Sequence, residues 1–285
     1  MGAHPLRKRR WRATGIAALV ATVALVATGC GVENWERGYL PGEPGITNQT
    51  DRMATLWTGS WIAALGVGVI TWGLILWCVV VYRRRKNDQS LPVQLRYHVP
   101  LELMYTILPV LMIAVLFFYT QRDMGAVLDT SAEPDVNIEV YGKMWSWDFN
   151  YVDDGVWETG IQAVNRGEPG VEETLPTLYL PVGERVEFTV NSRDVIHSFW
   201  VPAFLFKRDV FPGRTSEFQL IPEREGFYQG KCAELCGEYH SDMLFNVAVV
   251  SREEYDAHIA QLRARGQTGE LGGDLDRIQS DEETR

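Results

Sequence analysis

The sequence predicts a membrane-anchored all-β protein, in which a hairpin of two transmembrane helices precedes one β-rich domain. Three observations predict it. Residues 57–82 contain no charged side chain, residues 99–120 form a second apolar run, and polar and apolar residues alternate in short stretches between residues 129 and 251. The chain of 285 residues is long enough for one or two domains, and its 46% of hydrophobic residues suit a protein with membrane segments.

The first apolar run is long enough to cross a bilayer. As a helix that rises 1.5 Å per residue, residues 57–82 would extend about 39 Å, whereas the hydrocarbon core is about 30 Å thick. The second run, residues 99–120, carries one acid, Glu102, and a buried core helix is the alternative. We expect it to return through the membrane, because only a short segment separates the two runs.

That short segment predicts the orientation of the hairpin. Residues 83–98 hold four arginines and one lysine, and basic loops of membrane proteins lie in the cytoplasm. The segment before the first helix, residues 30–56, and everything after the second helix are then extracytoplasmic. We therefore expect a multi-pass protein of the plasma membrane.

The N-terminus has the features of a bacterial export signal. Basic residues between positions 7 and 12 precede a short apolar stretch, residues 16–26, and then small residues and Cys30. We expect residues 1–29 to be a cleaved signal of the lipoprotein type, which leaves a lipidated Cys30 as the first mature residue. Simple export and an uncleaved anchor remain the alternatives.

Alternating polar and apolar residues predict the strands of the β-domain, residues 129–251. Proline-glycine and glycine turns separate the stretches. Several short strands at this spacing predict an antiparallel sandwich or barrel. The clearest strand segments are residues 137–141, 177–180, 185–190, 216–220 and 244–250.

Two segments of the exported part do not follow the strand pattern. Residues 153–176 are rich in glycine and glutamate, and we interpret them as a long insertion between strands that could reshape a docking surface. Residues 252–285 begin as a short amphipathic helix and end in a glycine-rich acidic tail, which we expect to be disordered.

A dense group of metal-binding residue types lies near the end of the β-domain. Cys232, Cys236, His240 and Met243 fall within twelve residues, and His197 lies upstream. Thiolate and thioether ligands select copper(I), zinc or iron–sulfur centres, and a histidine, cysteine and weak methionine set is typical of electron-transfer copper. A single blue copper would use one thiolate. Two thiolates spaced C-x3-C can each bridge a pair of copper ions, with one imidazole for each ion.

Three other interpretations of these residues stay open. The two cysteines could form a disulfide, because the domain is predicted to be exported. A structural zinc site would use four cysteine or histidine ligands and has no use for Met243. A thioredoxin-type copper chaperone also carries C-x3-C with a distant histidine, but it would lack His240 and Met243. The C-x-x-C-H pattern of c-type haem attachment is absent from the sequence.

These residues carry a resemblance to a known family. The sequences Asp194-Val-Ile-His197-Ser, Lys207-Arg-Asp209-Val-Phe-Pro-Gly213-Arg214 and Cys232-x-Glu234-x-Cys236-Gly-x-x-His240-x-x-Met243 resemble subunit II of the haem–copper cytochrome c oxidases. The resemblance extends from about residue 57 to residue 259 and points to an actinobacterial lipoprotein type. It implies a Greek-key cupredoxin β-barrel, with His197 on one loop and residues 232–243 on another.

The resemblance also implies the ligands of the metal. His197, Cys232, Cys236, His240 and Met243 would bind a binuclear copper centre, CuA, through their side chains, and Glu234 would bind it through its backbone carbonyl. The Glu234 side chain would reach a magnesium or manganese ion at the interface with the catalytic subunit.

Five further residues have roles under this resemblance. Trp145 would lie over the copper site where electrons enter, although an ordinary core aromatic is the alternative. Glu102 would line the entrance of a proton pathway, although it could instead extend its carboxylate to the membrane surface. Asp194 would orient an imidazole, as metal-bound histidines require. Asp209 and Arg214 would join the interface network around the magnesium, and surface salt bridges are their alternative.

The implied function is that of an oxidase subunit. The chain would take electrons from a c-type cytochrome at CuA and pass them to haem in subunit I, which reduces oxygen to water and moves protons across the membrane. Its partners would be subunits I and III, membrane lipid, and a soluble or membrane-bound cytochrome, the latter within a bc1–oxidase supercomplex. The net charge of −10 favours a basic electron donor. We expect no nucleic-acid partner.

Three other proteins could share parts of this pattern. A quinol oxidase subunit has the helices and the barrel but has lost the copper ligands that are intact here. Nitrous oxide reductase has a similar copper motif but is a soluble enzyme with a large propeller domain, for which this chain has no room. A membrane-tethered copper chaperone would hold one labile copper ion, so the metal count separates it from an oxidase subunit.

Overall fold

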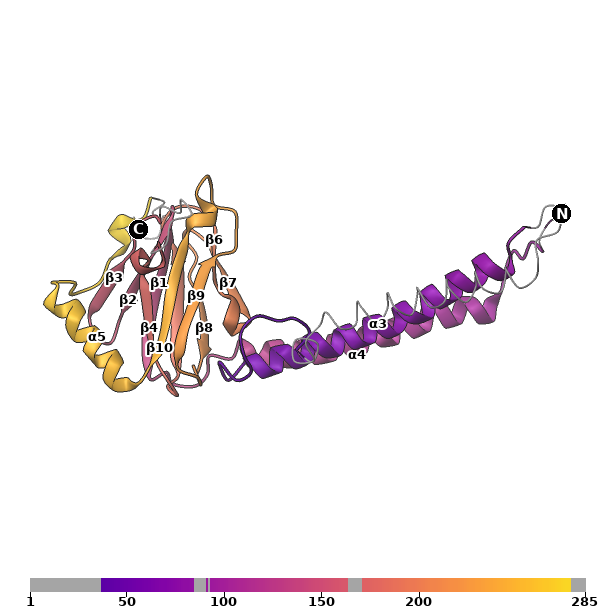
Figure 1. The fold of residues 1–285 in the computed structure, drawn as a ribbon, viewed down its shortest axis with the longest axis horizontal. Helices are drawn as coiled ribbons and strands as arrows, with labels where there is room; N and C mark the ends of the chain where they lie inside the picture. The colour runs from indigo at the N-terminus through magenta and orange to yellow at the C-terminus, as the bar shows by residue number, and fades with distance from the viewer. Residues whose placement is uncertain (1–36, 85–90, 92, 164–170, 278–285) are drawn as a thin grey trace, which may run out of the picture. The chain divides into compact units, whose positions relative to one another are not determined.

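The computed structural model describes residues 37–84, 91, 93–163 and 171–277 (Figure 1). The export signal predicted over residues 1–29 lies outside the described residues. So do Cys30, the predicted lipidation site, and residues 85–90 of the basic loop.

Two long helices occupy the positions of the predicted membrane segments. α3 (Thr50–Val81) and α4 (Val99–Val127) are both long and apolar enough to cross a membrane. They run side by side in Figure 1. Both extend beyond the apolar runs, since α3 begins before residue 57 and α4 continues past residue 120. The helices are longer than the apolar runs because the length of an apolar run reflects the thickness of the membrane, whereas a helix ends where its backbone hydrogen bonding ends.

A charged cluster joins the two helices beyond the apolar runs. The Asp123 carboxylate, which is 3% exposed, accepts hydrogen bonds from Arg52 of α3 at 3.1 Å and from the neighbouring Arg122 at 2.9 Å. A buried carboxylate needs such partners. The contact between Arg52 and Asp123 therefore fixes the register of α3 against α4 at this end.

The β-domain is a sandwich of two five-stranded sheets, and its strands are labelled in Figure 1. The first sheet has the order β3-β2-β1-β5-β8 and the second has the order β4-β10-β9-β6-β7. The strands of the first sheet are β1 (Val136–Lys143), β2 (Ser146–Tyr151), β3 (Val156–Thr159), β5 (Val186–Ser192) and β8 (Ser216–Leu220). Those of the second are β4 (Thr177–Pro181), β6 (His197–Val201), β7 (Phe206–Val210), β9 (Gly226–Cys232) and β10 (Leu244–Val250).

The expectation that the sheets are antiparallel throughout is wrong. β1 pairs parallel to β5, with Val140 opposite Val190, and β4 pairs parallel to β10, with Leu178 opposite Val247. The other strand pairs are antiparallel. Alternation of polar and apolar residues shows which face of a strand is buried, but it does not show the direction of the neighbouring strand.

Aromatic side chains fill the space between the sheets. Trp147 and Phe149 of β2, Phe188 of β5, Phe199 of β6 and Phe245 of β10 are all at most 4% exposed. The rings of Phe199 and Phe245 stack with centroids 4.9 Å apart, and the ring of Trp147 meets Phe245 edge to face at 5.4 Å. Burial of such large rings is a main source of stability for a domain of this size.

Part of the predicted insertion is a strand. β3 lies within residues 153–176 and forms a hairpin with β2, in which Tyr151 is opposite Val156. The chain turns at Gly155, whose φ of +59° favours glycine. Val156 is fully buried, so it belongs to the core. The glycine and glutamate content of the segment hid this short strand, and residues 164–170 of the insertion lie outside the description.

The C-terminal region is ordered further than the sequence predicts. α5 (Arg252–Ala264) buries Tyr255 and Ile259 against the β-domain. Residues 267–277, which we call the C-terminal strap, then run back along the first sheet. The Trp157 amide donates to Gln267 O at 3.2 Å, and the Leu271 amide donates to Asn150 Oδ1 at 3.1 Å. The expectation of disorder is therefore wrong for these residues, while 278–285 are outside the description.

Candidate metal centre

Strand ends bring the predicted metal ligands together. His197 is the first residue of β6, Cys232 is the last residue of β9, and Met243 directly precedes β10. β6 and β9 are neighbours, with Phe199 opposite Cys232. The Cys232 amide donates to Met243 O at 3.0 Å, which closes the base of the loop over residues 233–242. That loop includes a short 3-10 turn, η3 (His240–Asp242).

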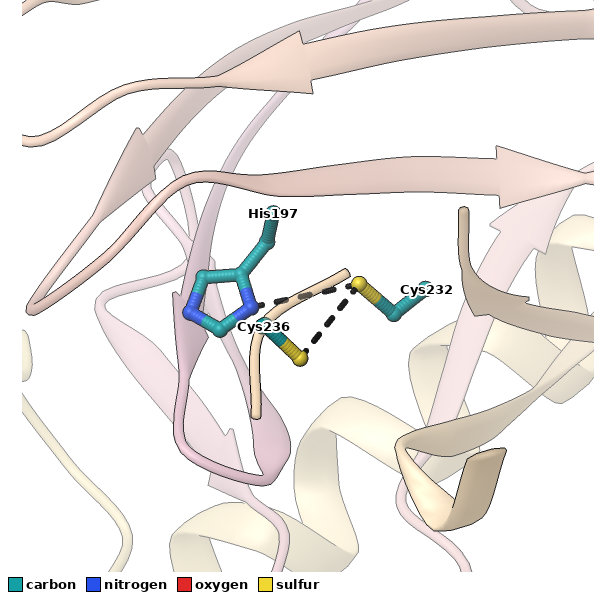
Figure 2. Close-up of side chains that lie close together, drawn as sticks. All are labelled: His197, Cys232 and Cys236. Carbon is teal, nitrogen blue, oxygen red and sulfur yellow. Dashed lines mark hydrogen bonds between the residues drawn. The ribbon is translucent and has the colours of Figure 1, made fainter. Parts of the chain in front are cut away.

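The donor atoms form a row with an imidazole at each end. His197 Nδ1 lies 3.9 Å from Cys232 Sγ, which lies 3.9 Å from Cys236 Sγ. Cys236 Sγ in turn lies 3.5 Å from His240 Nδ1. Figure 2 shows His197, Cys232 and Cys236 pointing toward one another, and their donor atoms all lie within 4.8 Å of each other.

Two weaker donors complete the cluster, one beside each sulfur. The carbonyl oxygen of Glu234 lies 3.2 Å from Cys232 Sγ. The thioether sulfur of Met243, which is fully buried, lies 3.7 Å from Cys236 Sγ. Each half of the row thus contains one imidazole and one weak donor, with the two sulfurs between them.

The geometry disfavours the disulfide interpretation. Both cysteines are free, and their sulfur atoms are 3.9 Å apart, whereas a disulfide bond is about 2.05 Å long. Each cysteine is 4% exposed, so the thiols are withdrawn from solvent. The His197, Cys232 and Cys236 side chains could together hold a metal ion.

Burial and local charge set the protonation of the sulfurs. Burial raises the pKa of Cys232, but hydrogen bonds from His197 and from backbone groups outweigh it and hold the pKa below its usual value. Burial and the charge on Cys232 raise the pKa of Cys236 to about 12. Cys232 is therefore the first of the two thiols to ionise, and a metal that binds both sulfurs displaces the Cys236 proton.

Asp194 fixes the orientation of His197. The carboxylate accepts a hydrogen bond from His197 Nε2 at 2.8 Å, and it also accepts from the amides of Met144 and Val195 at 2.8 Å. Burial raises the pKa of Asp194, but these hydrogen bonds outweigh it and lower the pKa below its usual value. Because a carboxylate can only accept here, the neutral imidazole carries its proton on Nε2 and leaves Nδ1 free toward Cys232, whereas only the charged imidazolium donates to the Cys232 sulfur.

Comparison with known proteins decides the family. Residues 136–250 match the family described as "Cytochrome C oxidase subunit II, periplasmic domain". The "Probable cytochrome c oxidase subunit 2" of Streptomyces avermitilis is 42% identical over 294 residues, which cover 93% of this chain and 90% of the relative. The chain belongs to the cytochrome c oxidase subunit II family.

Other relatives are similar. The "Cytochrome c oxidase subunit 2" of Mycobacterium tuberculosis is 34% identical over 309 residues. The match covers 91% of this chain and 84% of the relative. A crystal structure of the periplasmic domain of subunit II from Bradyrhizobium japonicum is 30% identical and covers 47% of this chain and 97% of its own, with a TM-score of 0.43.

Membership of the subunit II family confirms the predicted fold class, two apolar helices followed by a cupredoxin-like β-domain, here in the form of a sandwich. The resemblance found in the sequence is confirmed as well. The two helices, together with the match to a periplasmic domain, indicate membrane anchoring with an extracytoplasmic metal-site domain.

Trp145 lies over the cysteine loop. Its indole Nε1 donates to the carbonyl of Cys236 at 3.3 Å, and its ring meets Tyr239 edge to face with centroids 4.9 Å apart. The side chain is half-buried, whereas Trp147, two residues later, is fully buried in the core. Trp145 therefore lies between the solvent and the backbone of Cys236.

The other predicted site residues lie outside the cluster of donors. Glu102 is at the start of α4, where its carboxylate accepts from the His98 amide at 3.0 Å and so caps the helix. Asp209 is opposite Ser198 in the β6–β7 pair and contacts Lys207 at 3.2 Å. Arg214 is exposed beside the ring of Phe211, and the Glu234 side chain is exposed.

Gly142 is a site residue that the sequence interpretation missed. A Cβ atom at Gly142 would lie 2.9 Å from Cδ2 of His197, so the β1 strand can approach the imidazole only because this residue has no side chain. A glycine inside a strand pattern often marks such a close approach. That signal was present just before Trp145.

Proposed function

We propose that this chain receives electrons one at a time from a c-type cytochrome at a binuclear copper centre, CuA, and passes them to haem in the catalytic subunit I. There oxygen is reduced to water, and protons are translocated. The observation that carries the proposal is the row of donors from His197 through Cys232 and Cys236 to His240, with adjacent donors 3.5–3.9 Å apart.

The donor set fits a pair of copper ions better than a single ion. Six donors are more than one four-coordinate ion uses. The Glu234 carbonyl beside Cys232 and the Met243 sulfur beside Cys236 give each half of the row a third kind of ligand. A copper pair held there supplies one-electron redox chemistry, for which thiolate, thioether and imidazole ligands are suited.

The chain's own residues keep the ligands in place. His197, Met243 and both cysteines are buried, so water is kept from most of the row, whereas His240 at its other end is half-buried. Asp194 holds His197 with Nδ1 toward the sulfurs. The hydrogen bond from the Cys232 amide to the Met243 carbonyl keeps the loop closed. A site that is already rigid needs little rearrangement when an electron arrives.

Trp145 is the proposed point where electrons enter. It is half-buried, and its indole nitrogen contacts the backbone of a ligand, Cys236, at 3.3 Å. The neighbouring Leu235 is 78% exposed, so this loop presents an apolar surface to a partner. The net charge of −10 favours a basic cytochrome.

We assign the remaining predicted residues to the interface and the membrane. The exposed Glu234 and Arg214, with Asp209, are proposed to meet the catalytic subunit and a magnesium or manganese ion. Glu102 is proposed to admit protons from the cytoplasmic side. Both helices are proposed to cross the membrane, with the basic loop inside, Cys30 lipidated, and subunit III and the cytochrome within the same assembly.

An electron-acceptance assay tests this function. The copper-loaded full chain in detergent is mixed anaerobically with reduced cytochrome c, and cytochrome oxidation is followed by absorbance. We expect one cytochrome oxidised per chain, and none with the Cys236→Ser variant. Transfer of copper to an acceptor protein without oxidation of the cytochrome would contradict the proposal and would favour a chaperone.

A further inference from the structure

Arg193 is a buried cation directly before the residue that orients His197. Its side chain is 4% exposed, and Nε donates to the buried Asp148 carboxylate at 3.0 Å. The guanidinium carbon also lies 4.0 Å from the ring centre of Tyr141. These two contacts use one nitrogen and one face of the guanidinium, which leaves two nitrogens for other partners.

The C-terminal strap, residues 267–277, supplies those partners. Arg193 Nη1 donates to Gly272 O at 2.9 Å and to Asp276 Oδ1 at 3.0 Å, and Nη2 donates to Leu271 O at 3.2 Å. In return, the carbonyl of Arg193 accepts from the Arg277 amide at 2.7 Å. The strap therefore binds both the side chain and the backbone of Arg193.

The strap reaches Arg193 along a defined path. The Gly269 amide donates to Gly155 O at 2.8 Å, and the Trp157 indole donates to Thr268 O at 3.3 Å. Asn150 of β2 then exchanges two hydrogen bonds with Leu271, each 3.1 Å long. Contacts along the β3 edge and β2 thus fix the strap before it meets Arg193.

Arg193 connects the strap to the metal ligands. Its amide donates at 2.9 Å to the carbonyl of Gly142, the residue that lies against the ring of His197. The next residue, Asp194, bonds to His197 Nε2 at 2.8 Å. Movement of the Arg193 backbone would therefore displace the carboxylate that orients His197.

Charge balance makes this connection depend on the strap. Asp148 accepts from both Lys143 at 2.6 Å and Arg193 at 3.0 Å, and Asp276 is the second acid beside Arg193. Without the strap, the buried guanidinium would lose Asp276 and two carbonyls. Donors that are buried without partners are costly, so residues 192–195 would shift toward water.

We propose that the C-terminal strap is a positioning element of the metal centre, acting through Arg193 and Asp194 on His197. This inference rests on the proposed function, because it assumes that His197 is a copper ligand. The strap touches no donor atom itself, so its effect is on the orientation of His197 and on how firmly copper is held.

The test compares strap variants of the copper-loaded full chain in detergent. Asp276→Asn removes the charge that contacts Arg193, Arg193→Lys keeps the charge but loses the forked contacts, and a stop after Gly266 removes the strap. Asp274→Asn is the matched control, since this exposed acid lies two residues before Asp276. The readouts are the electron paramagnetic resonance spectrum and the rate of copper release to a chelator.

We expect the three strap variants to release copper about tenfold faster and to show an altered copper hyperfine pattern, because loss of groups that orient a ligand typically lowers metal affinity by about 10–100-fold. The control should match the wild type. If the truncated chain does not fold, Asp276→Asn decides.

Three results would overturn the inference. Unaltered spectra and release rates in the strap variants would show that the strap does not act on His197. A lower melting temperature with an unaltered spectrum would show that the strap only stabilises the fold. A wild-type chain that binds no copper pair would contradict both the proposed function and the inference. Failure of the inference alone would differ from this, because the wild type would still bind the copper pair and only the strap variants would behave unexpectedly.

Discussion

Asp194 shows how one side chain sets the chemistry of a ligand. Its carboxylate takes the proton-bearing Nε2 of His197 at 2.8 Å and leaves Nδ1 facing Cys232 Sγ at 3.9 Å. The same carboxylate is anchored by two backbone amides, so it cannot rotate away from the ring. The direction of the imidazole is therefore fixed before a metal binds.

Asp194→Asn should weaken copper binding by about 10–100-fold, because the amide is a poorer acceptor for Nε2–H and can turn its NH2 group toward the ring. Competition with a copper chelator measures the affinity. Asp256→Asn, which alters an exposed acid on α5, serves as the control. Equal affinities in the two variants would show that Asp194 does not position His197.

Trp145→Phe should slow electron delivery from reduced cytochrome c several-fold while the copper spectrum stays unchanged. Phenylalanine keeps much of the ring contact with Tyr239 but removes the N–H that contacts the Cys236 carbonyl. Stopped-flow absorbance measures the rate. Trp200→Phe is the control, since its ring lies over Lys231. A delivery rate in Trp145→Phe equal to that of this control would count against Trp145 as the point where electrons enter.

At the scale of elements, the pairing of β9 with β10 carries the cysteine loop. Gly230 of β9 is opposite Phe245 of β10, and a Cβ atom at Gly230 would lie 2.1 Å from Cζ of the Phe245 ring. Phe245 is fully buried and stacks on Phe199 of β6. The two strands that flank the ligand loop are thus packed with no space for a further methyl group.

Gly230→Ala should lower the free energy of unfolding by about 1–3 kcal/mol or more, as overpacking of a core does. Chemical denaturation of the full chain, followed by tryptophan fluorescence, measures it. Adding Phe245→Leu should recover part of the loss, because the smaller side chain makes room. If the two changes were simply additive, the close contact between Gly230 and Phe245 would not be the cause.

Alternation of polar and apolar residues in the sequence found β1, β4, β5, β8 and β10 and missed the other strands described. β5 alternates strictly between buried and half-buried residues, and its segment was found. All six residues of β2 are buried, so it does not alternate and was missed, and two glycines interrupt the apolar pattern of β9, which was missed as well. Alternation does not mark a strand such as β2 that is covered on both faces.

The proposed copper ligands could be found from the sequence because four of the side chains lie within residues 232–243. Arg193 and the C-terminal strap could not, because they join residues about 80 positions apart through contacts to backbone carbonyls. Any residue type offers a carbonyl, so the sequence of the strap carries no sign of its partner. The composition of the strap instead suggested disorder.

At the scale of the whole molecule, the basic loop and the metal domain are proposed to lie on opposite sides of the membrane. Gln94 lies in the loop, and Ser131 lies just before β1 of the metal domain; both are exposed. In intact cells a membrane-impermeant thiol reagent should label Ser131→Cys, and it should label Gln94→Cys only after permeabilisation, as judged by peptide mapping. Labelling of Gln94→Cys in intact cells would reverse the proposed topology.

The account as a whole depends on two copper ions that share the sulfurs of Cys232 and Cys236. Copper content and the electron paramagnetic resonance spectrum of the copper-loaded full chain test this most directly. We expect two coppers per chain and a seven-line hyperfine pattern, because one unpaired electron would be shared by two equivalent nuclei. One copper per chain with a four-line pattern would contradict a binuclear centre and, with it, the proposed role in electron transfer.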